Sequence, residues 1–281
     1  MDPVVDAHQH VWDLTVAEYP WLSPDYGVLY RTYGADELMP QLGRAGVDKT
    51  VLVQAADNRD DTEHMLSVAA RFDYVAGVVA WVPLNRPDKL EKELERLSAN
   101  PIVKGVRHLI HVEPDPDWLL RPAVVSALTL LAQQGLTLDI PAVLPRHLEH
   151  VPILADRVPG LRIVIDHLAK PPIKDRGWEP WATLLRRAAD APTVHAKVSG
   201  LNTAAALDGW TADDLRPYVD HAVDCFGPTR LMFGSDWPVL LLAGDYQRVW
   251  DETGRVLAGL EEADRRAIYG GTANDFYRLG L

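Results

Sequence analysis

The stretch GVVAWVPLNRPDKLEKELERL, residues 77–97, contains the pattern that decides the fold. It opens with an apolar run rich in valine over 77–82, which is typical of a buried β-strand. A loop with proline follows. From Pro87 to Leu97, apolar and charged residues recur with the spacing of an amphipathic helix that begins at proline. The stretch therefore predicts one strand, one loop and one helix.

The same unit recurs along the chain. Short apolar runs, from which we expect eight strands, occupy residues 4–5, 50–53, 77–82, 103–107, 136–140, 163–165, 194–198 and 231–233. Helix-length amphipathic segments occupy residues 35–45, 62–72, 87–97, 122–134, 180–189, 211–226, 246–257 and 261–279. This alternation indicates a parallel sheet covered by helices and closed as a (β/α)8 TIM barrel. An open doubly wound sheet is the alternative, but no G-x-G-x-x-G motif follows the first strand.

The amino-acid composition argues against several classes of protein. With 281 residues, 47% of them hydrophobic, the chain can form a single domain over residues 1–281. A net charge of -12 without any Lys/Arg-rich run argues against nucleic-acid binding, and no apolar run is long enough for a membrane span. Cys225 has no partner cysteine, and the start Met1-Asp2-Pro3-Val4 lacks the pattern of a secretory signal, so we expect a cytoplasmic protein. The sequence leaves open whether the protein forms a homo-oligomer.

Two histidines follow the first apolar run, in His8-Gln9-His10. Because side chains alternate along a strand, His8 and His10 should point the same way and Gln9 away from them. The last strand is followed by Ser235-Asp236-Trp237. Asp236 could complete a site with the two imidazoles by binding a metal, by accepting a proton from water, or both. The two motifs together predict a hydrolase.

The carboxyl ends of the predicted strands are unusually polar. In a TIM barrel the chemistry sits at these ends. Burying so many ionisable groups together without pairing would cost several kcal/mol, which a purely structural barrel would avoid. The residues at these ends are His8, His10, Gln54, Trp81, Arg107, His108, Asp139, Asp166, His167, Lys197, Ser199, Ser235 and Asp236.

These motifs carry a family resemblance that runs from end to end, over residues 5–12, 19–22, 103–108, 165–171, 197–201 and 231–239. The chain resembles the amidohydrolase superfamily, of the amidohydrolase 2 type. Within it, the chain is most similar to the sugar-lactonase-like branch that includes L-fuconolactonases, L-rhamnonolactonases and 2-pyrone-4,6-dicarboxylate lactonase. The resemblance implies a (β/α)8 barrel that opens a lactone ring by adding water.

The chain departs from the dinuclear members of that superfamily. Such relatives place a carboxylated lysine after strand four and a histidine after strand five, where this chain has Arg107-His108 and Asp139-Ile140-Pro141. We therefore do not expect two metals. The remaining set could hold one Zn²⁺ or Mn²⁺ with an open position for water, or could act without metal, as the resemblance to pyrone-dicarboxylate lactonase permits. This set comprises His8, His10, His167 and Asp236.

Lactone hydrolysis needs an activated water, stabilisation of the oxyanion and a proton for the departing alkoxide. We expect Asp236 to be the general base and acid, with a pKa raised by burial beside Trp237. The oxyanion would be met by a metal, or by the histidines as donors with Arg107 as a fixed cation. The alternative reading of Asp236 is a helix N-cap, and that of His167 a buried structural histidine. His108 and His111 could likewise be structural.

Nine tryptophans against four phenylalanines suggest a sugar-like substrate, since Trp stacks on the C–H faces of sugars. Alternatively the tryptophans plug the barrel mouth or pack helices. The long loop over residues 13–33 could form a lid. The residues expected to bind substrate are Arg107, His108, Trp12, Trp81, Trp237, Gln54 and Lys170.

The resemblance suggests a small-molecule substrate, namely an L-fucono-, L-rhamnono- or galactono-lactone. A dicarboxylate lactone is less favoured, because Arg107 is the single obvious carboxylate clamp at the strand ends. A metal-dependent decarboxylase of the same superfamily is disfavoured by the missing strand-five histidine. A catalytically silent barrel that binds a sugar acid would require Asp236 or the His8/His10 pair to be dispensable.

Overall fold

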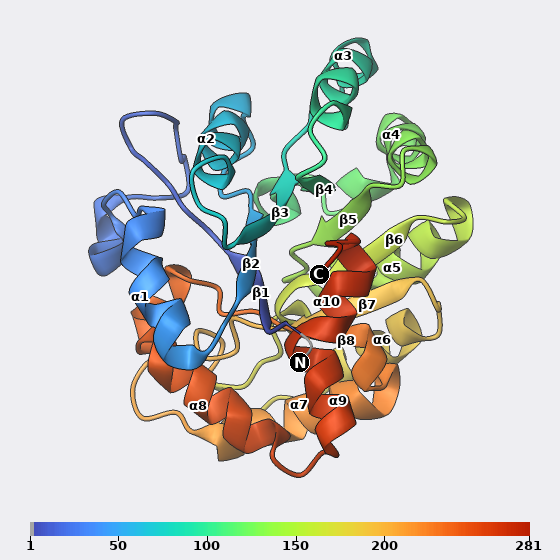
Figure 1. Ribbon diagram of the computed structural model, residues 1–281. Helices are drawn as coiled ribbons and strands as arrows, with labels where there is room; N and C mark the ends of the chain where they lie inside the picture. The colour runs from blue at the N-terminus through green and yellow to red at the C-terminus, as the bar shows by residue number, and fades with distance from the viewer. Residues whose placement is uncertain (1–2) are drawn as a thin grey trace.

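The computed structural model describes residues 3–281, so Met1 and Asp2, the first residues of the start discussed above, lie outside the described residues. Eight parallel strands follow one another in chain order around one sheet (Figure 1). They are β1 Val5–Gln9, β2 Lys49–Val53, β3 Val75–Ala80, β4 Val103–Arg107, β5 Thr137–Ile140, β6 Arg162–Ile165, β7 Val194–Val198 and β8 Leu231–Phe233.

The sheet is closed by the chain that follows β8 and the end of β1. Gln9 forms a parallel bridge with Trp237. The amide of Asp236 donates to the carbonyl of His8 at 2.8 Å, and the amide of His10 donates to the carbonyl of Trp237 at 2.7 Å. The predicted (β/α)8 barrel is thus confirmed, and its closure brings the two histidines beside Asp236.

Helices surround the sheet (Figure 1). Those between and after the strands are α1 Ala35–Ala45, α2 Arg59–Ala69, α3 Pro87–Ser98, α4 Pro122–Gln133, α5 Pro145–Arg157, α6 Trp181–Ala189, α7 Ala212–Phe226 and α8 Tyr246–Leu257. Proline occupies the first turn of α3, α4 and α5, where its missing N–H costs nothing. The set of segments expected from the sequence lacked α5, whose pattern is interrupted by Pro152 inside the helix. No helix within residues 3–281 is long and apolar enough to cross a membrane.

The helix expected over 261–279 forms over residues 262–277 and contains one irregularity. The segment divides into α9 Glu262–Arg266, a wider π-type turn Ala267–Gly271, and α10 Thr272–Tyr277. The turn packs directly against the start of the chain, because a Cβ on Gly270 would collide with the carbonyl of Pro3. This close approach needs glycine at position 270.

Helix α10 lies across the end of the barrel at which the chain begins (Figure 1). There Phe276 and Tyr277 pack against inward-facing apolar side chains of five strands. The lower layer of the barrel interior is therefore apolar and plugged. The apolar residues of this layer are Val5, Ala7, Val51, Val53, Val79, Val164, Met232, Ala273, Phe276 and Tyr277.

Candidate active site

A bulge in β1 turns the histidine pair into the barrel. Asp6 pairs with Thr50 and Gln9 with Leu52, so β1 has one residue more than β2 over this interval. Ala7 packs inside the lower layer, and the extra residue lets His8 face inward as well. As expected, His8 and His10 then point the same way, with their Nε2 atoms 3.2 Å apart.

His10 is held in one orientation by β2. Its Nδ1 lies 2.7 Å from the carbonyl oxygen of Val53, which can only accept, so Nδ1 carries the hydrogen. The lone pair of the neutral ring is therefore on Nε2, facing His8 and Asp236. Burial lowers the pKa of His10, so the ring is neutral at neutral pH. His10 thus offers an acceptor or ligand atom to the site.

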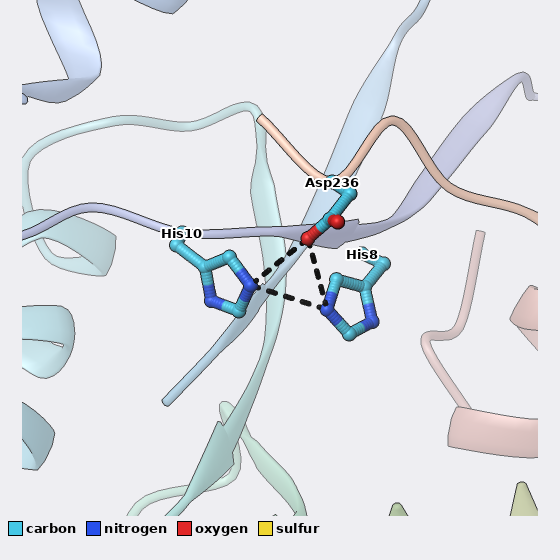
Figure 2. A group of neighbouring side chains, drawn as sticks. All are labelled: His8, His10 and Asp236. Atoms are coloured by element: carbon cyan, nitrogen blue, oxygen red, sulfur yellow. Dashed lines mark hydrogen bonds and ion pairs between the residues drawn. The ribbon is translucent and has the colours of Figure 1, made fainter. Parts of the chain in front are cut away.

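Asp236 projects its carboxylate toward both histidines (Figure 2). Its Oδ1 lies 3.4 Å from Nε2 of His10 and 3.8 Å from Nε2 of His8. Its backbone adopts φ 62°, a left-handed conformation that turns the chain sharply after β8. The side chain caps no helix in this arrangement and belongs to the histidine cluster.

The expected raised pKa of Asp236 is wrong. Burial does push the pKa upward, but the polar groups around the carboxylate, His167, His10 and the ammonium of Lys170, outweigh it, and the pKa lies well below its ordinary value. The apolar neighbours seen in the sequence are thus less important than the cations and donors that the fold brings in. Asp236 is ionised across the neutral range.

A left-handed turn after β6 positions two further side chains. His167, Leu168, Ala169 and Lys170 all have positive φ, between 48° and 60°, which is rare outside glycine. His167 Nδ1 lies 2.9 Å from the hydroxyl of Ser199 and 3.9 Å from Oδ2 of Asp236. Burial lowers the pKa of His167 to about 3, so its ring is neutral. The turn therefore aims His167 at Asp236.

Lys170 approaches the same carboxylate from the end of that turn. Its Nζ lies 3.9 Å from Oδ2 of Asp236 and donates to the carbonyl of Gly200 at 3.0 Å and to the hydroxyl of Thr203 at 2.8 Å. Burial lowers its pKa, although the Asp236 charge opposes this. Lys170 is thus a fixed donor beside Asp236, as a substrate-binding residue would be.

Below the histidines lies a buried layer of charged side chains. Arg107 donates from Nη1 to Oδ2 of Asp166 at 3.0 Å and from Nη2 to the carbonyl of Gln54. Lys197 Nζ lies 2.5 Å from Oδ2 of Asp139 and 3.1 Å from Oδ1 of Asp166. Burial raises the pKa of Asp166, but Lys197, His8 and Arg107 together hold it well below its ordinary value. Arg107, Lys197 and Asp166 of this network contact the ring nitrogens of His8 and hold the ring in place.

A cavity of about 180 Å³ opens above these groups. Its polar residues come from several strand ends and include three expected from the sequence as hydrolytic groups, namely His10, His167 and Asp236. Arg107 and Lys170, which the sequence predicts to bind substrate, also line it. The complete lining is His10, Trp21, Ala55, Arg107, Leu109, His111, Pro141, Val143, His167, Lys170, Asp236 and Val239.

The expectation that Trp12 and Trp237 face a substrate is wrong. Both are almost completely buried, and neither lines the cavity. Trp12 donates from its indole to the carbonyl of Arg31, and the two rings pack edge-on against Tyr33. They fasten the loop over residues 13–33 to the barrel. Trp21, from that same loop, lines the cavity instead.

His108, Trp81 and Gln54 also lie outside the cavity lining, against expectation. His108 stacks on Trp118, with ring centroids 4.0 Å apart, and its Nε2 lies 2.7 Å from Glu113. Trp81 donates to the other ring nitrogen of His108. The side-chain amide of Gln54 donates to the backbone carbonyl of Arg107, and the backbone carbonyl of Gln54 accepts from the Arg107 guanidinium. Gln54 therefore orients Arg107. These side chains therefore pack outside the cavity and contact residues at the strand ends.

His111, for which the sequence leaves a structural and a functional role equally open, lines the cavity. It follows β4 by a short turn, which is the one sequence signal that could have found it. Burial and the charge of Arg107 lower its pKa to about 4, so it presents a neutral imidazole to the cavity.

The donor set fits one divalent metal ion. One nitrogen each from His8 and His10 and one oxygen of Asp236 lie within 4.8 Å of one another, and two imidazoles with a carboxylate are ligands that Zn²⁺ commonly takes. His167, which we expected in this set, instead groups with His8 and Asp166. That second group is poorly available, because both Asp166 oxygens already lie close to Arg107 and Lys197. The structure thus allows an optional single ion.

An eight-stranded barrel with this histidine and aspartate cluster at its strand ends defines a barrel enzyme of hydrolytic type. The family model described as Amidohydrolase matches residues 5–279, and the chain belongs to that family, as the resemblance implied. It is 39% identical to an L-fucono-1,5-lactonase of Burkholderia ambifaria, over 98% of this chain and 95% of that protein. It is 35% identical to an L-fucono-1,5-lactonase of Burkholderia multivorans, over 98% and 96% of the two chains.

The fold is also similar to that of a relative whose structure has been solved. A crystal structure of an amidohydrolase from Burkholderia multivorans with bound zinc superimposes with a TM-score of 0.90 at 35% identity, covering 98% of this chain and 99% of that one.

Proposed function

We propose that the protein hydrolyses a sugar lactone of the L-fucono-, L-rhamnono- or galactono-lactone class by adding water to the lactone carbonyl. The observation that carries the proposal is the ionised Asp236 at the wall of a small cavity, in contact with His10 and flanked by His167, Lys170 and Arg107. The names of the relatives in the genus Burkholderia support the same reaction.

The cavity suits a small, amphipathic ring. Its volume of about 180 Å³ is below the roughly 300–1,000 Å³ of sites that bind drug-sized ligands, which favours a single sugar ring. One set of lining residues is polar, and another is apolar: Trp21, Leu109, Pro141, Val143 and Val239. A sugar lactone presents hydroxyls and C–H groups together, and the methyl group of a 6-deoxy sugar fits an apolar wall.

In the proposed reaction Asp236 orients a water molecule and accepts its proton as the new C–O bond forms at the lactone carbonyl. Because its depressed pKa makes it a weak base, proton transfer must accompany the attack rather than precede it. The same acid then returns the proton to the ring oxygen that leaves as an alcohol. The products are the open-chain sugar acid and no by-product.

The oxyanion would be stabilised by donors already in place. Arg107 is a buried cation at the cavity, and neutral His167 can donate a hydrogen bond. A divalent ion held by His8, His10 and Asp236 would supply polarisation of the carbonyl and of water when bound. In this proposal Lys170 and His111 bind the hydroxyls of the sugar.

The competing functions gain no support from a specific contact. Asp139, at the strand-five position where a decarboxylase would need a histidine, is engaged with Lys197 and Tyr277. Arg107 is engaged with Asp166 and Gln54, which leaves less of it for a dicarboxylate. We infer that residues 1–281 act as one domain. The cytoplasmic location and the homo-oligomer stay predictions of the sequence.

The test compares wild-type protein with Asp236→Asn in proton release from a panel of sugar 1,4- and 1,5-lactones, in metal-free buffer and corrected for spontaneous hydrolysis. The variant keeps the shape but loses the base, so kcat/KM should fall by about 10²–10⁴-fold. Asp213→Asn, an exposed carboxylate on α7, is the control and should leave the rate unchanged. Full activity in Asp236→Asn would overturn the mechanism, and CO₂ release from an aromatic acid by the wild type would favour the decarboxylase.

A further inference from the structure

Two buried cations flank His8, one at each ring nitrogen. Lys197 Nζ lies 3.1 Å from Nδ1, and Arg107 Nη1 lies 3.3 Å from Nε2. Lys197 is completely buried and Arg107 is 4% exposed. Their counter-charges are Asp139, which pairs with Lys197, and Asp166, which pairs with both cations and whose Oδ1 also lies 3.2 Å from Nδ1 of His8. His8 thus contacts a buried cation at each ring nitrogen, and water does not screen these charges.

The hydrogen bonds around His8 allow two tautomers. A neutral imidazole has one nitrogen with a lone pair and one with a hydrogen. Metal binding through Nε2 requires the hydrogen on Nδ1, where Oδ1 of Asp166 at 3.2 Å can accept it. Lys197 can only donate, so its contact with Nδ1 favours the opposite tautomer, with the hydrogen on Nε2.

The tautomer that Lys197 favours leaves no ligand for a metal. With its hydrogen on Nε2, His8 donates to Nε2 of His10 at 3.2 Å. The other nitrogen of His10 already carries the hydrogen that faces the carbonyl of Val53. Lys197, His8, His10 and Val53 therefore form one continuous chain of donors and acceptors, in which both Nε2 atoms of the candidate metal site are occupied.

Arg107 opposes a metal in the other tautomer. When Nε2 of His8 carries the lone pair, Nη1 of Arg107 at 3.3 Å is placed to donate to it. A metal at this nitrogen must displace that hydrogen bond and lie close to a guanidinium that cannot lose its charge. Each cation thus disfavours metal binding by both a hydrogen bond and charge repulsion.

We propose that Arg107 and Lys197 make the His8/His10/Asp236 group a weak, exchangeable metal site, so that Zn²⁺ occupies it only at raised metal concentration. The two cations hold His8 in hydrogen bonds that exclude a ligand and repel a dication. This inference concerns metal affinity and does not depend on which substrate the protein hydrolyses.

The experiment titrates Zn²⁺ alone into chelator-treated protein, followed by calorimetry and by competition with a zinc-sensitive dye. Lys197→Gln and Arg107→Gln, each of which removes one cation, should bind Zn²⁺ at least about tenfold more tightly than wild type. Lys89→Gln is the matched control, because it makes the same change in net charge at an exposed position of α3. Its affinity should equal that of wild type.

The outcomes separate the proposal from its alternatives. Wild-type protein that keeps one bound Zn²⁺ through chelation and dialysis would overturn it, and this measurement needs no variant. Equal or weaker Zn²⁺ binding by both variants, folded by circular dichroism, would also overturn it. Should Lys197→Gln not fold, Arg107→Gln decides. The single substitution His8→Ala, with Arg107 and Lys197 retained, should abolish the weak Zn²⁺ binding. Undiminished binding by this variant would place the metal elsewhere and contradict the assignment.

Discussion

Left-handed backbone conformations gather at the cavity. Asp236, His167 and Lys170 are non-glycine residues with φ between 50° and 62°, and Gly200 beside them has φ 56°. Each such non-glycine residue costs roughly 1–3 kcal/mol, and strain of this kind concentrates at functional sites. At the scale of the residue, the cavity therefore depends on backbone turns that aim three polar side chains at one point.

Gly200 is the residue whose replacement tests this arrangement. In Gly200→Ala the new Cβ would lie 2.7 Å from Oδ2 of Asp236 and 2.7 Å from Nδ1 of His167, closer than real contacts allow. We expect a stability loss of about 1–2 kcal/mol from the left-handed backbone, together with a large fall in kcat/KM. Urea unfolding and lactone hydrolysis measure the two effects.

Gly209→Ala provides the control for backbone strain alone. Gly209 has φ 76°, but a Cβ there would meet nothing within 4 Å. This variant should lose similar stability and keep its activity. If the two variants lost activity equally, displacement of Asp236 and His167 could not be the reason for the effect of Gly200→Ala.

At the scale of the element, β1 and α10 contribute to two different layers of the barrel interior. The bulge in β1 adds His8 to the upper, polar layer, while α10 closes the lower, apolar layer. The two layers meet at Asp139, which accepts hydrogen bonds from Lys197 and from Tyr277 of α10. The C-terminal helix is thus tied to the charged floor of the site.

The bond between α10 and that floor should contribute measurably to stability. Tyr277 donates to Oδ2 of Asp139 at 2.6 Å, a buried, charge-assisted bond. Tyr277→Phe should lower the free energy of unfolding by about 1.5–3 kcal/mol, since bonds to charged groups are stronger than neutral ones. Chemical denaturation measures this.

Tyr74→Phe is the comparison, because Tyr74 donates to a neutral carbonyl, that of Ala35, at 2.9 Å in a half-buried setting. Its loss should be smaller, about 0.5–1.5 kcal/mol. An equal or greater loss in Tyr74→Phe would contradict the account of α10 given above.

At the scale of the whole molecule, acid stability depends on histidines that the fold keeps neutral. His195 of β7 packs against Phe276 of α10, and burial, with the charges of Arg230 and Arg162, lowers its pKa to about 4 from 6.5. Between these values the unfolded chain binds a proton at this site that the folded protein does not. The stability from this site is therefore present above pH 6.5 and lost as the pH falls toward 4.

His195→Gln should remove this part of the pH dependence. The free energy of unfolding of the variant minus that of wild type should rise as the pH is lowered from 6.5 to 4, and stay constant between pH 7 and 8. Urea denaturation across this range provides the measurement. A difference that does not change with pH would show that His195 titrates alike in both states.

Much of the fold and part of the site could be predicted before the structure. Apolar runs of strand length alternating with amphipathic helices predict the barrel, because burial on both faces of a parallel sheet leaves few other arrangements. The rule that barrel chemistry sits at strand ends then brings His10, His167 and Asp236 together, and adds Arg107 and Lys170. All five line the cavity.

The remaining features follow from neighbours that are distant in the chain. The sequence by itself determined the barrel, the histidine pair and the carboxylate, since these depend on local periodicity and on which strand a residue ends. Only the tertiary structure decided that the pKa of Asp236 is lowered, that Trp12 and Trp237 are buried while Trp21 lines the cavity, and that a bulge turns His8 inward. Burial, charge and register are sums over contacts in space, and no pattern along one strand contains them.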